Sequence, residues 1–169
     1  MFTKSDIEKY FTGEKSESLI FIALGMAGII LAILFFFFFK TSLHKGMAVP
    51  FACIGLIMGI TGLSVYRSSD RLRIENVYAY DMNPLQLKEK ELPRMKKVMK
   101  NFQLLRWVEI FLLAAGLGLY IYFIRDFRSG FWRGFGFALA VMAVVALTAD
   151  YFAERRGKIY IRGLESFVK

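Results

Sequence analysis

Two acidic side chains are the residues of this chain with the clearest potential for chemistry in an apolar setting. Glu109 lies inside a long run of hydrophobic residues, and Asp150 lies at the end of another such run. A carboxylate in these surroundings is costly and often marks an ion or proton site or a docking point. The alternative is a structural role, in which the carboxylate forms ion pairs that fix the register of helix ends. The structural role is favoured, because acids near a membrane interface are tolerated better than acids at the midplane.

The two acids are expected at nearly the same depth in the membrane. Arg125 and Arg133 flank the far ends of the two runs, and Glu109 and Asp150 lie 16 and 17 residues inward from them. At a rise of 1.5 Å per helical residue, these separations correspond to about 24 to 26 Å. Both carboxyl groups are therefore expected just inside the inner boundary of the hydrocarbon.

Three arginines can complete a polar cluster around these acids. Arg106 lies one helical turn from Glu109, so an i, i+3 ion pair is available. The other two arginines follow the ends of neighbouring apolar runs and can approach from there. The sequence thus predicts a polar cluster at the cytoplasmic mouth of a helix bundle, formed by Arg67, Arg106, Glu109, Asp150 and Arg155.

Four apolar runs must position this cluster. Each has about the 20 residues that a helix needs to cross ~30 Å of hydrocarbon. Of the 169 residues, 56% are hydrophobic, which is too apolar for an ordinary soluble domain. Short turns join the first run to the second and the third to the fourth, which favours antiparallel hairpins. The runs are residues 18–39, 47–66, 104–124 and 131–149.

The predicted fold is an all-α membrane protein, a four-transmembrane-helix bundle of two antiparallel hairpins with amphipathic cytoplasmic helices. Its organisation divides the chain into five segments. They are a cytoplasmic N-terminal amphipathic segment (1–17), the first transmembrane hairpin (18–66), a basic cytoplasmic connection (67–103), the second transmembrane hairpin (104–149) and a cytoplasmic tail (150–169).

The distribution of basic residues predicts the orientation. Eighteen of the 23 Lys and Arg residues lie on the side that holds both termini and the central connection, and five lie on the other side. Because basic loops resist translocation, both termini are expected in the cytoplasm. The net charge of +9 then follows from this topology and from attraction to anionic lipid headgroups. Nucleic-acid binding is not required to explain it.

Small residues predict where the helices approach one another. Helices in lipid associate through close backbone contacts at Gly and Ala, and each apolar run contains candidates. Pairs at a spacing of four occur often by chance, and the contacts can be within one chain or between copies. The candidate packing residues are Gly25, Gly28, Gly55, Gly59, Ala114, Gly118, Gly130 and Gly134.

The polar segments are expected to form short amphipathic helices. Thr3 and Asp6 have the spacing of a capping box, and Gly13 is a candidate stop signal. A basic amphipathic helix is predicted from Arg94 straight into the third apolar run. Weak alternation in residues 71–74 and 158–162 favours a short strand pair there.

Several functional classes lack the residues that they need. Cys53 is the single cysteine and His44 the single histidine, so neither a disulfide nor a zinc-like ligand set is expected. The sequence contains no paired-histidine metal motif and no glycine-rich phosphate loop. No metal and no cofactor is predicted, and an enzyme is the third-ranked class.

Short polar motifs recur near the membrane boundaries along nearly the whole chain. They are Glu17, Val65-Tyr-Arg-Ser-Ser-Asp70, Tyr78-Ala-Tyr-Asp-Met-Asn-Pro84, Glu91-Leu-Pro-Arg-Met95, Val98-Met-Lys-Asn-Phe102, Arg106-Trp-Val-Glu109 and Asp150-Tyr-Phe-Ala-Glu154. In these motifs the chain resembles small four-helix inner-membrane proteins of Gram-negative bacteria to which no function is assigned. The resemblance implies a bacterial inner membrane, and it adds slight weight to a role in toxin immunity.

Two functions are therefore expected from the sequence. The first is a non-enzymatic inner-membrane protein that binds another protein, such as a toxin immunity factor or an accessory subunit. Its partner is then a membrane or secreted protein, or a second copy of the chain. The alternative is a small oligomeric channel or transporter with a polar cytoplasmic entrance.

Overall fold

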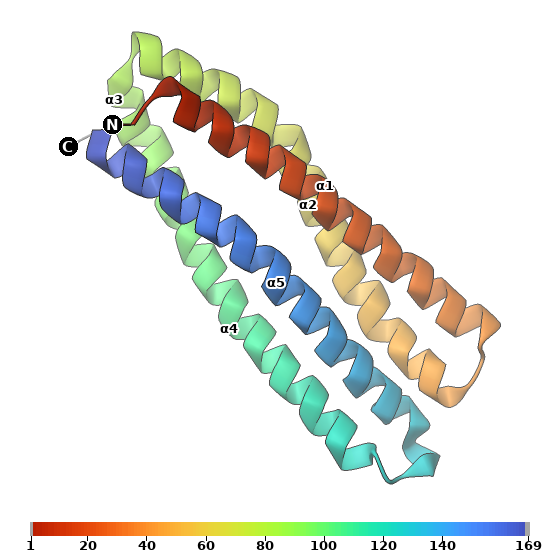
Figure 1. Ribbon diagram of the computed structural model, residues 1–169. Coiled ribbons are helices and arrows are strands. Elements are labelled where there is room, and N and C mark those ends of the chain that lie inside the picture. The colour runs from red at the N-terminus through yellow and green to blue at the C-terminus, as the bar shows by residue number, and fades with distance from the viewer. Residues whose placement is uncertain (1, 168–169) are drawn as a thin grey trace.

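The computed structural model describes residues 2–167, apart from the side chain of residue 127, and every regular element in that part of the chain is helical. Four long helices lie along one another, and both described chain ends lie with α3 at one end of the bundle (Figure 1). We call this the basal end and the opposite one the turn end. The long helices are α1 (Lys4–Ile33), α2 (Ser42–Met82), α4 (Leu92–Phe123) and α5 (Gly130–Phe167). The short elements are η1 (Leu34–Phe38), α3 (Pro84–Gln86), η2 (Leu87–Glu91) and η3 (Phe127–Ser129).

The four long helices are of membrane-spanning length and composition. Together with the short elements that continue them, they have 35 to 41 residues, and each contains a sufficiently apolar stretch. The predictions of an all-α protein and of four such helices are therefore confirmed. Since a bilayer needs only about 20 residues, each helix continues beyond its apolar run into a polar part at the basal end. Residues 1, 168 and 169 of the predicted terminal segments lie outside the described part.

Small residues bring the helices into backbone contact. α1 packs along α2, α4 packs along α5, and the two pairs meet mainly through α2 and α5. A Cβ atom added to Gly25 would lie 2.6 Å from the carbonyl oxygen of Gly55. On the other pair, a Cβ added to Gly116 would lie 2.6 Å from the backbone nitrogen of Ala140. Only glycine permits approaches this close, so these residues set the helix spacing.

Short polar turns connect the helices at the turn end. Lys40 has a left-handed backbone, with φ of 52°, and the Thr41 hydroxyl then accepts the His44 N–H at 3.3 Å. In the second turn the Asp126 carboxylate accepts the Arg128 N–H at 3.0 Å and the Ser129 hydroxyl at 2.6 Å. The hydrogen bond from Ser129, reinforced by that from the Arg128 backbone, holds the pKa of Asp126 below its usual range.

The first helix begins as predicted but does not stop at Gly13. The Thr3 N–H donates to the Asp6 carboxylate at 2.8 Å, as in a capping box. α1 then continues through Gly13, which leaves room for the Arg156 side chain of α5, whose Cδ lies 3.1 Å from the position of an added Cβ. Packing against α5 thus outweighs the cost of about 1 kcal/mol for a glycine inside a helix.

The expected strand pair is wrong. Residues 71–74 lie in α2 and residues 158–162 lie in α5, both helical throughout. The apolar positions that suggested alternation belong to helical faces, because Leu72 and Tyr160 both pack in one buried cluster. The central connection is therefore mainly a continuation of α2 and α4, with a break at Asn83.

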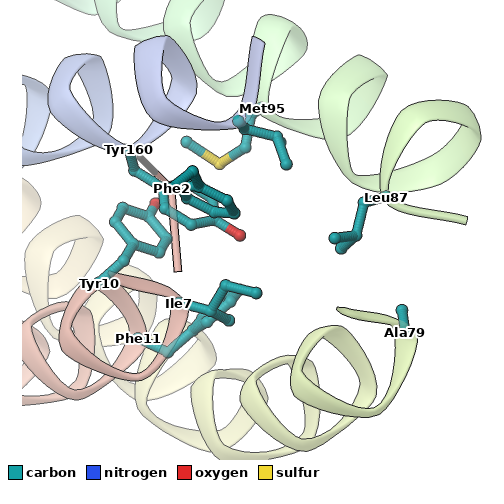
Figure 2. Close-up of a cluster of buried hydrophobic side chains, with 9 residues drawn as sticks. Phe2, Ile7, Tyr10, Phe11, Ala79, Leu87, Met95 and Tyr160 are labelled. Carbon is teal, nitrogen blue, oxygen red and sulfur yellow. The ribbon is translucent and has the colours of Figure 1, made fainter. Parts of the chain in front are cut away.

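A buried aromatic and aliphatic cluster closes the basal end. Its side chains come from Phe2 ahead of α1, from all four long helices and from η2, and they lie in the space between the helices (Figure 2). The rings of Tyr10 and Tyr160 stack at 4.1 Å with an angle of 11° between their planes. This packing stabilises the polar ends of the helices. The members are Phe2, Ile7, Tyr10, Phe11, Ala79, Leu87, Met95, Tyr160 and Leu164.

Candidate functional site

A cavity of about 310 Å³ lies between the four long helices, next to the basal cluster. Its walls are mixed, with apolar side chains such as Phe21 and Phe102 beside charged groups. The residues that line it come from the last polar turns and the first apolar turns of each helix. The cavity is therefore expected at the level of lipid headgroups in a membrane. Its charged lining residues are Glu14, Glu17, Arg94, Asp150 and Arg156.

Each arginine of the lining is held by a carboxylate. Arg94 donates two hydrogen bonds to Glu91, both at 2.7 Å, and Glu91 is only 3% exposed. The guanidinium of Arg94 also lies 5.6 Å from the centre of the Phe11 ring. Arg156 of α5 forms an ion pair with Glu17 of α1. Because both guanidinium groups are already neutralised, the cavity does not offer a free positive charge to an anion.

Glu14 is satisfied by neutral donors instead. It accepts the Tyr10 hydroxyl at 3.1 Å and the Ser69 hydroxyl at 2.9 Å. The first donor lies one turn away on α1, and the second lies on α2. These hydrogen bonds hold the carboxylate in place without cancelling its charge, so the cavity has more negative than positive groups.

Glu109 and Asp150 of the predicted cluster do lie together. They lie across the contact between α4 and α5, between the Arg106–Glu154 pair and the close approach of Gly116 to Ala140, and their carboxyl groups interact there. Glu109 is 8% exposed, and its Oε2 atom is buried with no hydrogen-bond partner. Asp150 is half-buried and lines the cavity. The acid pair therefore lies at the side of a polar space.

Arg106 forms a different ion pair from the one that its spacing suggested. It donates to Glu154 on α5, which also accepts Lys158 at 2.7 Å. Glu154 is 5% exposed, and sequence reasoning did not single it out as a partner. The contact between helices thus replaces the expected i, i+3 pair with Glu109. Arg106 remains close enough to Glu109 for its charge to be felt there.

The other two arginines of the predicted cluster lie elsewhere. Arg67 is exposed and lines a shallow hollow on the outer face of α2. Arg155 is also exposed and lines a groove of about 630 Å³ between α1 and α5 at the basal end. Within residues 2–167, neither of them forms an ion pair with Glu109 or Asp150. The structure thus keeps three of the five predicted residues in one place.

The predicted small residues divide in the same way. Gly25 and Gly28 lie against Gly55 and its neighbours in α2, and Gly59 lies beside Gly25. Gly130 and Gly134 lie against Leu43 at the start of α2. Ala114 and Gly118 are exposed, and Gly116 makes the α4 contact with Gly136 and Ala140 in their place. Gly116 is two residues from each, so it faces the opposite side of the helix.

One sequence signal would have led to Glu14. The buried positions Phe11, Ser18, Gly25 and Ala32 recur every seven residues on α1. Ile7 and Gly28 belong to the same face, and Glu14 lies between them on this repeat. A seven-residue spacing marks a continuous packing stripe. No comparable pattern identifies Glu91 or Glu154, because their burial depends on the partner helix.

The residues described here can supply charge and hydrogen bonds inside a polar space. Within residues 2–167 no group of three or more His, Cys, Asp or Glu side chains is arranged to hold a metal ion. No protein-family model, no curated protein and no solved structure matches this chain. The resemblance to small inner-membrane proteins of Gram-negative bacteria therefore stays a prediction, and function has to be argued from the geometry.

Proposed function

We propose that this chain is a non-enzymatic multi-pass protein of a bacterial inner membrane that acts by binding another protein at its basal half. In this proposal the four helices form two antiparallel transmembrane hairpins, with both termini in the cytoplasm. The excess of basic residues at the basal end supports the orientation. Attraction to anionic headgroups then holds the basal part against the inner leaflet.

The observation that carries the proposal is the unequal packing of the two halves. At the turn end, a Cβ added to Gly46 would lie 2.0 Å from the carbonyl oxygen of Phe131. A Cβ on Gly134 would be equally close to the oxygen of Leu43. Backbones this close leave no room for side chains between α2 and α5 there, and the hollow of about 330 Å³ between α1 and α2 in this half is apolar. The polar cavity and the basal groove both lie in the basal half, which supports binding at that half.

The basal groove indicates the chemistry of the partner. Its walls combine the bases Lys9 and Arg155 with the apolar side chains of Phe152 and Ile159. The other charged residues of the lining are Arg156 and Glu17, which pair with each other, and Asp6. Ile159 is 66% exposed, although it lies beyond the apolar run of α5. Basic and apolar groups together favour an acidic, partly apolar segment of a protein. A secreted toxin or a membrane subunit that carries such a segment fits the proposal.

Site-specific photo-crosslinking in cells tests this proposal. A photo-reactive phenylalanine analogue is placed at Phe152 or Ile159, and at Phe111 of α4 as a membrane-level control. We expect a discrete protein adduct from the first two positions and lipid alone from the third. Arg155→Glu should lower the adduct yield, and Arg67→Glu, on the outer face of α2 and outside the groove, should not. Adducts of equal yield at all three positions, or none at any, contradict the proposal.

Cysteine labelling tests the proposed orientation. In a Cys53→Ala background, Ser166→Cys and Lys40→Cys place single thiols at the basal end and in the first turn. A membrane-impermeant maleimide added to intact spheroplasts should label position 40 and leave position 166 unlabelled until the membrane is opened. The reverse pattern would overturn the cytoplasmic assignment of the termini.

The alternative is a small oligomeric channel or transporter with a polar cytoplasmic entrance. The observation that favours it is the acidic pair of Glu109 and Asp150 beside the cavity. If this function holds, purified protein in liposomes should carry a cation flux that Glu109→Gln changes without changing the assembly. Recovery of a homo-oligomer alone from crosslinked membranes also favours this alternative.

A further inference from the structure

The acid pair of Glu109 and Asp150 lacks a positive partner of its own. Glu109 is more than nine-tenths buried, and its Oε2 atom points at no hydrogen-bond donor. Asp150 faces it from α5. Two carboxylates that face each other in low-polarity surroundings cannot both be ionised without a large cost in free energy. The arrangement therefore needs a positive charge between or beside the two groups.

The neighbouring bases do not provide that charge. Arg106 and Lys158 both bind Glu154, so the three acids and two bases of this group carry one net negative charge. On the cavity side, Glu17 and Arg156 neutralise each other, and Arg94 is paired with Glu91. Glu14 keeps its charge and adds to the negative potential of the cavity. One additional monovalent cation would neutralise the group of three acids and two bases around Glu109.

We propose that Glu109 and Asp150 form a binding site for a single positive charge, reached from the basal end through the cavity that Asp150 lines. The ligand is a proton shared by the two carboxyl groups or a monovalent metal cation held between them. A divalent ion is disfavoured, because two carboxylates with no third acidic or imidazole ligand make a poor site for it. The inference does not depend on whether the chain binds a partner.

The cavity leads from the acid pair into the basal half, beside the buried cluster at that end. It extends from Tyr10 and Arg94 near the basal cluster to Thr61 and Asp150 at the start of the apolar runs. Asp150 is therefore the exchanging group, and Glu109 lies behind it. In the turn half, the glycine contacts close the path. The site then exchanges with one side of the membrane only.

Reaction of the wild-type protein in lipid nanodiscs with dicyclohexylcarbodiimide tests the site. This apolar reagent modifies protonated carboxyl groups, and mass spectrometry of the digested protein locates the adduct. We expect modification of Glu109 or Asp150 at pH 6 and a lower yield at higher pH, where the proton is lost from the pair. The matched controls are Glu91 and Glu154, which are equally buried but ion-paired. They should stay unmodified.

The same samples distinguish the two ligands. If sodium or potassium chloride protects the pair from the reagent and choline chloride does not, the site takes a metal cation. If none of the three salts protects, it takes a proton. A metal that stays bound would block modification altogether, so the melting temperature is also measured on removal of sodium and potassium. The protein should then lose stability as the pH rises.

Two variants keep the inference falsifiable. Glu109→Gln and Asp150→Asn each remove the repulsion and should abolish the dependence of the melting temperature on pH and on cations. Glu165→Gln, at an exposed acid of α5 whose contact is Lys96, leaves the acid pair and the Arg106–Glu154 pair intact and should keep both dependences. The inference is overturned if the wild-type pair is never modified and its melting temperature follows neither pH nor monovalent cations. It is also overturned if Glu109→Gln and Asp150→Asn leave those dependences unchanged.

Discussion

Arg106 of α4 pairs with Glu154 of α5, 48 residues away in the sequence, and not with Glu109 one turn along its own helix. The pair joins two helices, and the Glu154 carboxylate is almost fully removed from solvent. Lys158 completes the arrangement from the next turn of α5. Glu154 therefore holds α4 and α5 together at the level where their apolar parts meet their polar basal parts.

Replacing this buried acid should destabilise the bundle. Glu154→Gln leaves Arg106 and Lys158 without a counter-charge, and we expect a loss of about 1–3 kcal/mol in the free energy of unfolding. The loss is smaller than for a fully buried pair, because the Arg106 side chain is partly exposed. Unfolding by SDS in mixed micelles measures it.

The control is an exposed acid on the same helix. Glu165 lies 3.8 Å from Lys96, and both side chains are substantially exposed. Glu165→Gln should change the stability by less than about 0.5 kcal/mol. Equal effects of the two variants would show that Glu154 contributes only surface charge.

Glycine substitutions should separate contact faces from exposed ones. Gly134→Ala places a Cβ in collision with the carbonyl of Leu43 at the start of α2, so the two backbones must move apart. We expect a loss of about 1–3 kcal/mol. Gly118→Ala meets open space, and it should be neutral or stabilise the helix by up to about 1 kcal/mol. If the two variants unfold alike in the same micelles, the close approach at Gly134 does not exist.

These glycines also show how far the sequence determines the packing. The small residues of α1 could be assigned to a contact face, because their spacing continues as a stripe along the helix. On α4 the sequence offers Ala114, Gly116 and Gly118, and the choice among them depends on the rotation of the helix against α5. Lipid and protein accept the same apolar side chains, so hydropathy does not determine that rotation.

The candidate site was predictable to a similar extent. The depth of Glu109 and Asp150 follows from the rise per residue and the ends of the apolar runs, and they face each other. The partner of Arg106 did not follow, because an i, i+3 acid and an acid on the next helix compete for one guanidinium. Similarly, Arg94 was predicted on a basic amphipathic helix, and no partner was predicted for it or for Arg156. Arg156 pairs with Glu17, which lies far away in the sequence, whereas Arg94 pairs with Glu91 only three residues before it.

Arg94 should not tolerate replacement by lysine. Its guanidinium makes two parallel hydrogen bonds to Glu91 and lies over the Phe11 ring, whereas an ammonium group is a single point charge. We expect Arg94→Lys to lower the free energy of unfolding by about 1–2 kcal/mol. It should also make the connection between α2 and α4 more mobile. Limited proteolysis near Asn83, together with thermal unfolding, measures both effects.

The matched variant is Lys96→Arg, two residues further along α4. Lys96 is exposed, and its contact with Glu165 is long at 3.8 Å. This reverse exchange should leave the melting temperature and the proteolysis rate unchanged. If Arg94→Lys is digested at the wild-type rate, the paired hydrogen bonds to Glu91 do not contribute to the stability of the basal end.

The second turn should loosen in acid because of Asp126. Its carboxylate accepts hydrogen bonds from Ser129 and Arg128, and these hold its pKa below the usual value. A lowered pKa in the folded state means that the stabilisation is complete above the unfolded pKa of about 3.9. It is lost as the pH falls through the folded value. Hydrogen exchange at the Arg128 amide, corrected for the intrinsic rate, should therefore accelerate below about pH 4.

Substitution by asparagine isolates the charge from the hydrogen bond. Asp126→Asn keeps a side-chain oxygen that can accept from the same two donors, but this oxygen does not titrate in the range used. The variant should protect the Arg128 amide at every pH, without the acid-induced acceleration. Asp126→Ala removes the acceptor and should exchange fast throughout. If the asparagine variant accelerates in acid as the wild type does, a different group controls the turn, because Asp126 is then absent as an acid.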